Sequence, residues 1–277
     1  MRDAGSLARF LGRILAGFLV RTFAGCAMAV VAVAAGAQAP SRVALLIGNA
    51  AYPDAPLRNP LNDVREVAAS LRALGFSVTA HENLKLGEMR ETLRKFVLGS
   101  RSADVRLVYY AGHGLQMRGH SYLLPVGVRI ESETDVLERT ADATELVEQL
   151  SAIEKGANVV IIDACRVHPM FSTRTRKMWA VKRGLSGLTA PSGTLVAFST
   201  RPGQVARDGD GDISVYTRHL TRSLRQAPEL PVEVFFKRVR AGVVAETGSK
   251  QVPWESSDLS GELCFRPDAK GQCVRAP

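Results

Sequence analysis

The chain has 277 residues, of which 46% are hydrophobic and 23% are charged, and its formal net charge is +9. This composition excludes a disordered or low-complexity chain and is sufficient for one sizeable buried core. The basic excess favours weak attraction to anionic surfaces, but aromatic residues make up only 6% of the chain, which argues against a nucleic-acid partner.

Residues 1–39 have the layout of a secretory signal peptide. Arginines at positions 2, 9 and 13 precede an apolar run from Thr22 to Ala37, and Ala37-Gln38-Ala39 forms a small-x-small cleavage site. The apolar run has about 16 residues, fewer than the ~20 that a transmembrane helix needs. We therefore expect an exported protein, periplasmic or secreted, without stable membrane insertion after signal cleavage. An uncleaved N-terminal membrane anchor is the alternative.

Strand-like and helix-like segments alternate along the rest of the chain. Strands are expected at 42–48, 76–81, 105–112, 122–126, 158–163 and 193–200, and helices at 62–74, 86–98, 142–154, 214–226 and 231–246. The strand segments are apolar on both faces, which is typical of a parallel sheet covered by helices on both sides. The sequence therefore predicts an α/β fold, a three-layer α/β/α sandwich with a mostly parallel central sheet.

A histidine and a cysteine follow two of these predicted strands. His113 comes after the strand at 105–112, in a glycine-rich turn, and Cys165 comes after the strand at 158–163. Because the carboxyl ends of parallel strands meet at one edge of a sheet, we expect the two side chains to lie close together. A thiol beside an imidazole can serve as a nucleophile with its proton acceptor. The glycines on either side of His113 are expected to leave its ring uncovered.

Three cysteines remain after signal cleavage. In an oxidising compartment Cys264 and Cys273 are candidate disulfide partners, which leaves Cys165 as the odd thiol. The chain has no Cys-x-x-Cys pair and no Gly-x-x-x-x-Gly-Lys loop, so zinc binding, dithiol exchange and P-loop nucleotide binding are not expected.

These motifs together resemble the caspase-like cysteine peptidases. The resemblance is carried by YYAGHG around His113, by DACR around Cys165, and by ALLIGNAAY, LRNPLNDVREV and QVPWESSDL in the same order as in the family. It is closest to the bacterial metacaspase-like branch. The resemblance implies a peptidase domain over residues 40–266, with a large-subunit-like part at 40–170, a basic loop at 171–190 and a small-subunit-like part at 191–266. Residues 267–277 are then a C-terminal tail.

The resemblance also implies a cysteine endopeptidase with a catalytic dyad. Cys165 would attack the scissile carbonyl, His113 would transfer the proton, and the backbone N–H groups of Gly114 and Cys165 would bind the oxyanion. Asp63 and Asp163 would bind an arginine or lysine at the substrate's P1 position, so protein or peptide substrates with basic P1 residues are the expected partners. We expect a monomer. A catalytically silent caspase-like scaffold is the alternative.

The basic loop suggests self-processing, because an enzyme with this preference could cut its own loop. The candidate positions are Arg174, Arg176, Lys177 and Arg183. We expect no cofactor or metal. Calcium is the alternative, because residues 208–212 resemble the start of an EF-hand loop, although Ile213 and His219 stand where that loop needs glycine and glutamate.

Overall fold

A computed structural model describes residues 41–165, 188–201 and 211–274. Residues 40–277 form one compact unit. The predicted signal segment and most of the basic loop lie outside the described residues. Within the described ranges, every helix is too short or too polar to cross a membrane.

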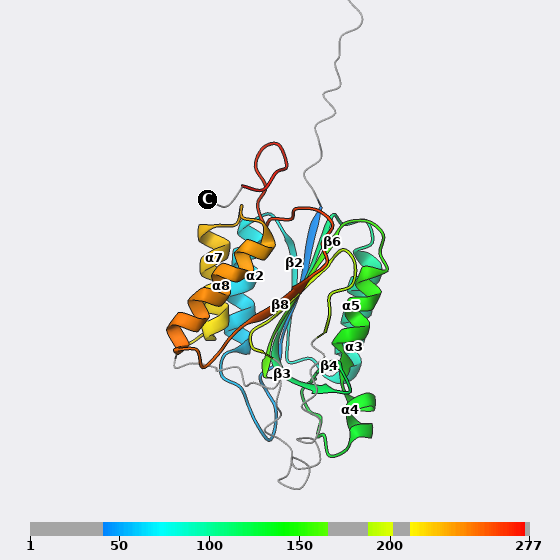
Figure 1. Cartoon of the computed structure of the whole chain (residues 1–277). Coiled ribbons are helices and arrows are strands. Elements are labelled where there is room, and N and C mark those ends of the chain that lie inside the picture. The colour runs from blue at the N-terminus through cyan, green and yellow to red at the C-terminus, as the bar shows by residue number, and fades with distance from the viewer. Residues whose placement is uncertain (1–40, 166–187, 202–210, 275–277) are drawn as a thin grey trace, which may run out of the picture. The chain divides into compact units, whose positions relative to one another are not determined.

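The centre of this unit is a sheet of mostly parallel strands (Figure 1). Its strand order is β2 (Ser77–Glu82), β1 (Arg42–Gly48), β3 (Val105–Met117), β6 (Ala157–Cys165), β7 (Thr194–Phe198) and β8 (Trp254–Ser257). The strands from β2 to β7 are parallel, and β8 runs antiparallel to β7. Two short strands, β4 (His120–Leu123) and β5 (Ala141–Asp142), extend the sheet from the end of β3.

Helices cover both faces of the sheet (Figure 1). One face carries α2 (Pro60–Ala73), α7 (Val215–Gln226) and α8 (Val232–Thr247), and the other carries α3 (Leu86–Gly99) and α5 (Ala143–Ser151); α4 (Glu133–Arg139) lies beyond the β4 end. Alternate residues of each strand face opposite layers, so that Leu46 packs in the core under α2 while Leu45 packs in the core under α3. The predicted three-layer sandwich is confirmed.

Strand β3 is longer than the sequence predicted. Up to His113 it pairs with β6, and from Gly114 to Met117 it pairs with β4 instead. A two-residue hairpin joins β3 to β4, with positive φ values at Arg118 (51°) and Gly119 (87°), as a tight hairpin turn requires. The glycine-rich turn expected directly after residue 112 was therefore wrong, because the strand continues there and pairs with β4.

A disulfide and a main-chain hydrogen bond connect the C-terminal residues to this unit. Cys264 and Cys273 form a disulfide with Cα atoms 5.6 Å apart. Beside it, the ring of Phe265 packs against Phe235 with ring centroids 4.7 Å apart. The N–H of Val274 donates to the carbonyl of Glu229 at 2.9 Å. The described residues beyond 266, predicted as a tail, are thus tied to the domain by the disulfide and by the Val274 contact, although most of them are exposed.

Candidate functional site

Strands β3 and β6 bring the predicted catalytic residues together. They are neighbours in the sheet, and their register pairs the Cα of His113 with the Cα of Cys165. Paired residues on adjacent strands lie about 4.8 Å apart. The expected meeting of the two strand ends is confirmed at the level of the backbone. Cys165 is the last residue of β6, and its side chain lies outside the described part of the structure.

The backbone of His113 is fixed by a pair of tyrosines. Its N–H donates to the hydroxyl of Tyr52 at 3.0 Å, and its carbonyl accepts from the hydroxyl of Tyr110 at 2.7 Å. The Tyr52 ring also packs on the imidazole, with centroids 4.4 Å apart. His113 is consequently only 3% exposed. The expectation of an uncovered ring was wrong, because Tyr52 covers it.

A backbone carbonyl orients the imidazole. The Nε2 atom of His113 lies 2.7 Å from the carbonyl oxygen of Ala55. A carbonyl oxygen can only accept, so Nε2 carries the proton and Nδ1 is the nitrogen that can take a proton from a thiol. Ala55 was not among the predicted site residues, because a main-chain oxygen has no signature in residue type.

Gly112 is required by the close approach of the two tyrosines. A Cβ atom at this position would lie 2.6 Å from the Tyr110 hydroxyl and 2.8 Å from the Tyr52 hydroxyl. Burial raises the pKa of Tyr52 to about 12 and the pKa of Tyr110 well above its ordinary value. Both hydroxyls therefore stay neutral at physiological pH and remain available as hydrogen-bonding groups for the main chain of His113.

Gly114 follows His113 in β3 and pairs with Leu123 of β4. Its backbone and that of Cys165 lie at the same edge of the sheet, where β3 leaves β6. The predicted oxyanion-binding role of their N–H groups stays a prediction.

The structure also brings together the two predicted substrate-binding carboxylates. Asp63 lies in the first turn of α2 and is 2% exposed, whereas Asp163 lies in β6 and is 8% exposed. Ser214, the N-cap residue of α7, contacts both. Its N–H donates to Oδ1 of Asp63 at 2.8 Å, and its hydroxyl donates to Oδ2 of Asp163 at 2.7 Å. Ser214 was not predicted, because these contacts join residues far apart in the chain.

The negative charge of this carboxylate pair affects the pKa of a neighbouring tyrosine, Tyr109. Burial raises the pKa of Tyr109 well above its ordinary value, and the negative charges of Asp163 and Asp63 raise it further. Both carboxylates therefore lie near one phenol, beneath α7 and at the same edge of the sheet as His113. Two buried carboxylates form a negative site that suits a cation.

Other predicted positions fall partly or wholly outside the described residues. The self-cleavage candidates Arg174, Arg176, Lys177 and Arg183 all do, as do Asp208 and Asp210 of the possible calcium loop. Asp212 of that loop is exposed and lies 3.8 Å from Arg58. Among the described residues, no three His, Cys, Asp or Glu side chains gather as a metal site. Calcium binding stays untested.

A family model described as "Caspase domain" matches residues 41–264. Mucosa-associated lymphoid tissue lymphoma translocation protein 1 of Homo sapiens is 36% identical over 129 residues, and its Mus musculus homologue is 35% identical over the same length. Caspase-1 of Sus scrofa is 29% identical over 138 residues. These alignments cover 46–47% of this chain, but only 15%, 15% and 32% of the respective relatives.

The fold of this chain is also similar to that of a solved structure. The crystal structure of caspase-1 from Spodoptera frugiperda aligns with a TM-score of 0.62 and 21% sequence identity, covering 83% of this chain and 92% of that one. At this identity the likeness concerns the arrangement of strands and helices.

Proposed function

Because the chain belongs to the caspase-domain family of cysteine peptidases, we propose that it is a cysteine endopeptidase that cleaves peptide bonds after arginine or lysine. The observation that carries the proposal is the register that pairs His113 with Cys165, together with the Ala55 carbonyl that leaves Nδ1 of the imidazole as the proton acceptor. Asp63 and Asp163 supply the charge for a basic P1 side chain.

The proposed mechanism has two steps. His113 Nδ1 accepts the thiol proton of Cys165, and the thiolate attacks the scissile carbonyl while backbone N–H groups of Gly114 and Cys165 bind the oxyanion. The imidazolium, stabilised by the Ala55 carbonyl, then protonates the leaving amine, and an acyl-enzyme remains. In the second step His113 takes a proton from water, which attacks the thioester and releases the acid with the free thiol.

Short fluorogenic peptides ending in arginine, lysine or aspartate test this proposal. We expect turnover of the first two, no turnover with Cys165→Ala, and at least about a thirtyfold lower kcat/KM for arginine with Asp163→Asn, because a substrate cation would then lose a buried partner charge. Asp212→Asn is the matched control, since this carboxylate is 89% exposed. Turnover of the aspartate peptide alone would contradict the basic preference.

If the wild-type protein turns over none of the three peptides while Cys165 can still be alkylated, the scaffold alternative is favoured. In that case the caspase-like domain would bind partners without cutting them.

We also propose self-processing in the basic loop, because Arg174, Arg176, Lys177 and Arg183 offer basic P1 residues. Incubation of the purified protein followed by sequencing of new N-termini tests it. Equal nicking in Cys165→Ala would contradict self-processing.

Export to an oxidising compartment is proposed on two grounds. One is the signal-like layout of residues 1–39, and the other is the disulfide between Cys264 and Cys273, a bond that persists mainly outside the cytosol. We further propose that the protein acts as a monomer without a cofactor.

A further inference from the structure

Ser214 is held in one orientation by hydrogen bonds on both sides of its hydroxyl. The Thr217 N–H donates to its Oγ at 3.0 Å, which is the N-cap contact of α7, and the same Oγ donates to Oδ2 of Asp163 at 2.7 Å. The residue is 4% exposed. Because a carboxylate oxygen can only accept, the single hydroxyl proton is directed at Asp163.

Oδ2 of Asp163 is a shared acceptor in this cluster. Besides Ser214, the hydroxyls of Thr217 and Tyr109 lie 3.3 Å and 3.5 Å from it. The Ser214 contact is the shortest of the three. Through its main-chain N–H the same residue also donates to Asp63, so that one residue contacts both carboxylates.

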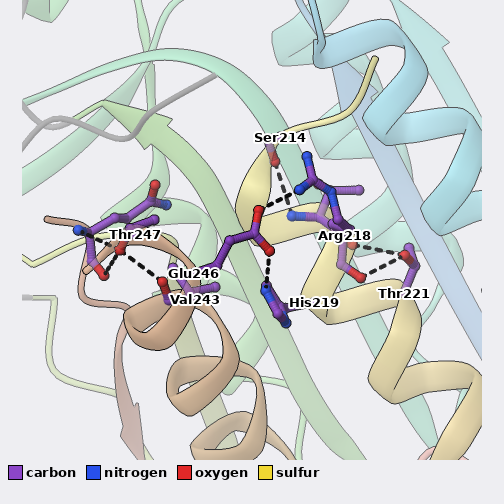
Figure 2. Close-up of polar contacts among 9 residues, drawn as sticks. Ser214, Arg218, His219, Thr221, Val243, Glu246 and Thr247 are labelled. Carbon is purple, nitrogen blue, oxygen red and sulfur yellow. Dashed lines mark hydrogen bonds and ion pairs between the residues drawn. The ribbon is translucent and has the colours of Figure 1, made fainter. Parts of the chain in front are cut away.

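Helix α7 itself is anchored on α8, as Figure 2 shows. Glu246 of α8 is hydrogen-bonded to Nε2 of His219 at 2.7 Å and forms an ion pair with Arg218. Both partners lie within the first two turns after Ser214. The N-terminus of α7 is therefore held in place by tertiary contacts, and Ser214 is held with it.

We propose that Ser214 is a positioning residue for substrate specificity, which holds the Asp163 carboxylate where, together with Asp63, it binds the P1 cation. The proposal rests on the proposed function, because it concerns the same substrate site. Two like charges close together in a buried site repel each other, and a neutral donor between them offsets that repulsion. Loss of the hydroxyl therefore weakens recognition of the cation while leaving the dyad of His113 and Cys165 intact.

Three variants separate this role from a structural one. Ser214→Gly removes the hydroxyl but keeps the N–H that contacts Asp63, and glycine is an acceptable N-cap residue. Ser214→Thr restores the hydroxyl. Thr221→Val is the matched control on the same helix, because Thr221 is fully buried and its hydroxyl donates to the Thr217 carbonyl at 2.9 Å without contacting a carboxylate.

The measurement compares inactivation by two peptide chloromethyl ketones that differ only in arginine or alanine at P1. Iodoacetamide, which has no P1 side chain, reports the reactivity of Cys165 alone. We expect the arginine-to-alanine rate ratio to fall about tenfold or more in Ser214→Gly, as for a lost hydrogen bond to a charged group. The ratio should return to within about threefold of wild type in Ser214→Thr. The iodoacetamide rate should not change in any variant.

Three outcomes would overturn the inference. One is a wild-type ratio in Ser214→Gly, and another is a parallel loss of the iodoacetamide rate, which would show that Ser214 acts on the dyad or the fold. The third is a wild-type enzyme that shows no preference for arginine. This result would contradict the proposed function, and the inference that rests on it. If Ser214→Gly does not fold, Thr217→Val removes a more distant donor to the same Oδ2 atom and should give a smaller fall in the ratio; no fall would also contradict the proposal.

Discussion

The His113 imidazole depends on a tyrosine that no catalytic motif contains. Tyr52 accepts the His113 N–H, donates to the Leu124 carbonyl at 3.0 Å and covers the imidazole with its ring. Because the main chain and the ring of His113 are both restrained by this one side chain, Tyr52 acts on the proton acceptor indirectly.

Replacement of Tyr52 by phenylalanine keeps the ring but leaves the buried His113 N–H without its acceptor. We expect kcat to fall about tenfold, with little change in KM, since an unsatisfied buried donor costs about 1–3 kcal/mol. Steady-state kinetics on the arginine peptide measure this. Tyr122→Phe, in the same apolar cluster, is the control and should stay within about twofold of wild type. An unchanged kcat in Tyr52→Phe would show that the ring alone positions His113.

At the scale of elements, β3 places the site by changing partners. His113 is its last residue paired with β6, and the next residue already pairs with β4. Strand β6 ends at this point, so β3 continues beyond the parallel strands with β4 alone, at the carboxyl edge where ligands bind in such sheets.

The contact between α7 and α8 depends on a glycine. A Cβ atom on Gly242 would lie 2.2 Å from Nδ1 of His219, so α8 can approach α7 only without a side chain here. We expect Gly242→Ala to lower the free energy of unfolding by about 1–3 kcal/mol, as overpacking does. Gly99→Ala in α3 is the control, because nothing lies within 4 Å of its Cβ position. Urea unfolding measures both, and equal stabilities of the two variants would contradict the close approach.

The amino ends of β3 and β6 are joined by a buried arginine. Arg106 is fully buried and donates to the side-chain oxygen of Asn158 at 2.7 Å, to the carbonyl of Ala103 at 2.9 Å and to the carbonyl of Lys155. Burial lowers its pKa from the ordinary value. The guanidinium therefore satisfies acceptors from two loops and a strand at once.

Replacement of Arg106 by methionine keeps much of the volume and removes every one of these donors. We expect the free energy of unfolding to fall by about 3 kcal/mol or more, because several buried acceptors would lose their hydrogen-bond donor. Lys155→Met breaks the exposed ion pair with Asp104 nearby and should cost under about 1 kcal/mol. Chemical denaturation measures the free energy of unfolding of both variants. A similarly small decrease in Arg106→Met and Lys155→Met would mean that water replaces the guanidinium.

At the scale of the whole molecule, all five tyrosines of the chain are buried. Burial is the largest cause that raises the pKa of each, to about 12 for Tyr52 and well above the ordinary value for Tyr109, Tyr110 and Tyr216; the pKa of Tyr122 is also raised. Each folded-state pKa lies above the unfolded value of about 10. The buried neutral tyrosines therefore contribute their full stabilisation of the folded state below pH 10. This contribution is lost as the pH rises through their folded-state pKa values.

In an alkaline titration the buried tyrosines should ionise together, in one cooperative transition in which the protein unfolds. We expect the free energy of unfolding to fall above pH 10 by about 1.4 kcal/mol per pH unit for each tyrosine that is neutral in the fold and ionised in the unfolded chain. Tyrosinate absorbance should rise together with the loss of the circular dichroism signal. A gradual rise near pH 10 in a protein that stays folded would contradict the burial of these phenols.

Much of the site could be predicted because it lies on short motifs at strand ends. The order of apolar runs indicated the sandwich, and the positions of His113 and Cys165 after two such runs indicated that they meet, since all parallel strands end at one edge. The turn expected after Gly112 was wrong because glycines next to an apolar run are typical of a turn, whereas here Gly112 makes room for two tyrosine hydroxyls within a continuing strand.

The sequence by itself determined the fold class, the family resemblance and the residue types of the dyad, because these depend on local periodicity and on short motifs. Only the tertiary structure decided which groups restrain them. Ser214 contacts Asp63 across 151 residues, and the contact of Ala55 with His113 is made by a main-chain oxygen that every residue possesses. Such contacts depend on how the helices pack and on which strands pair, and no local pattern of side chains encodes them.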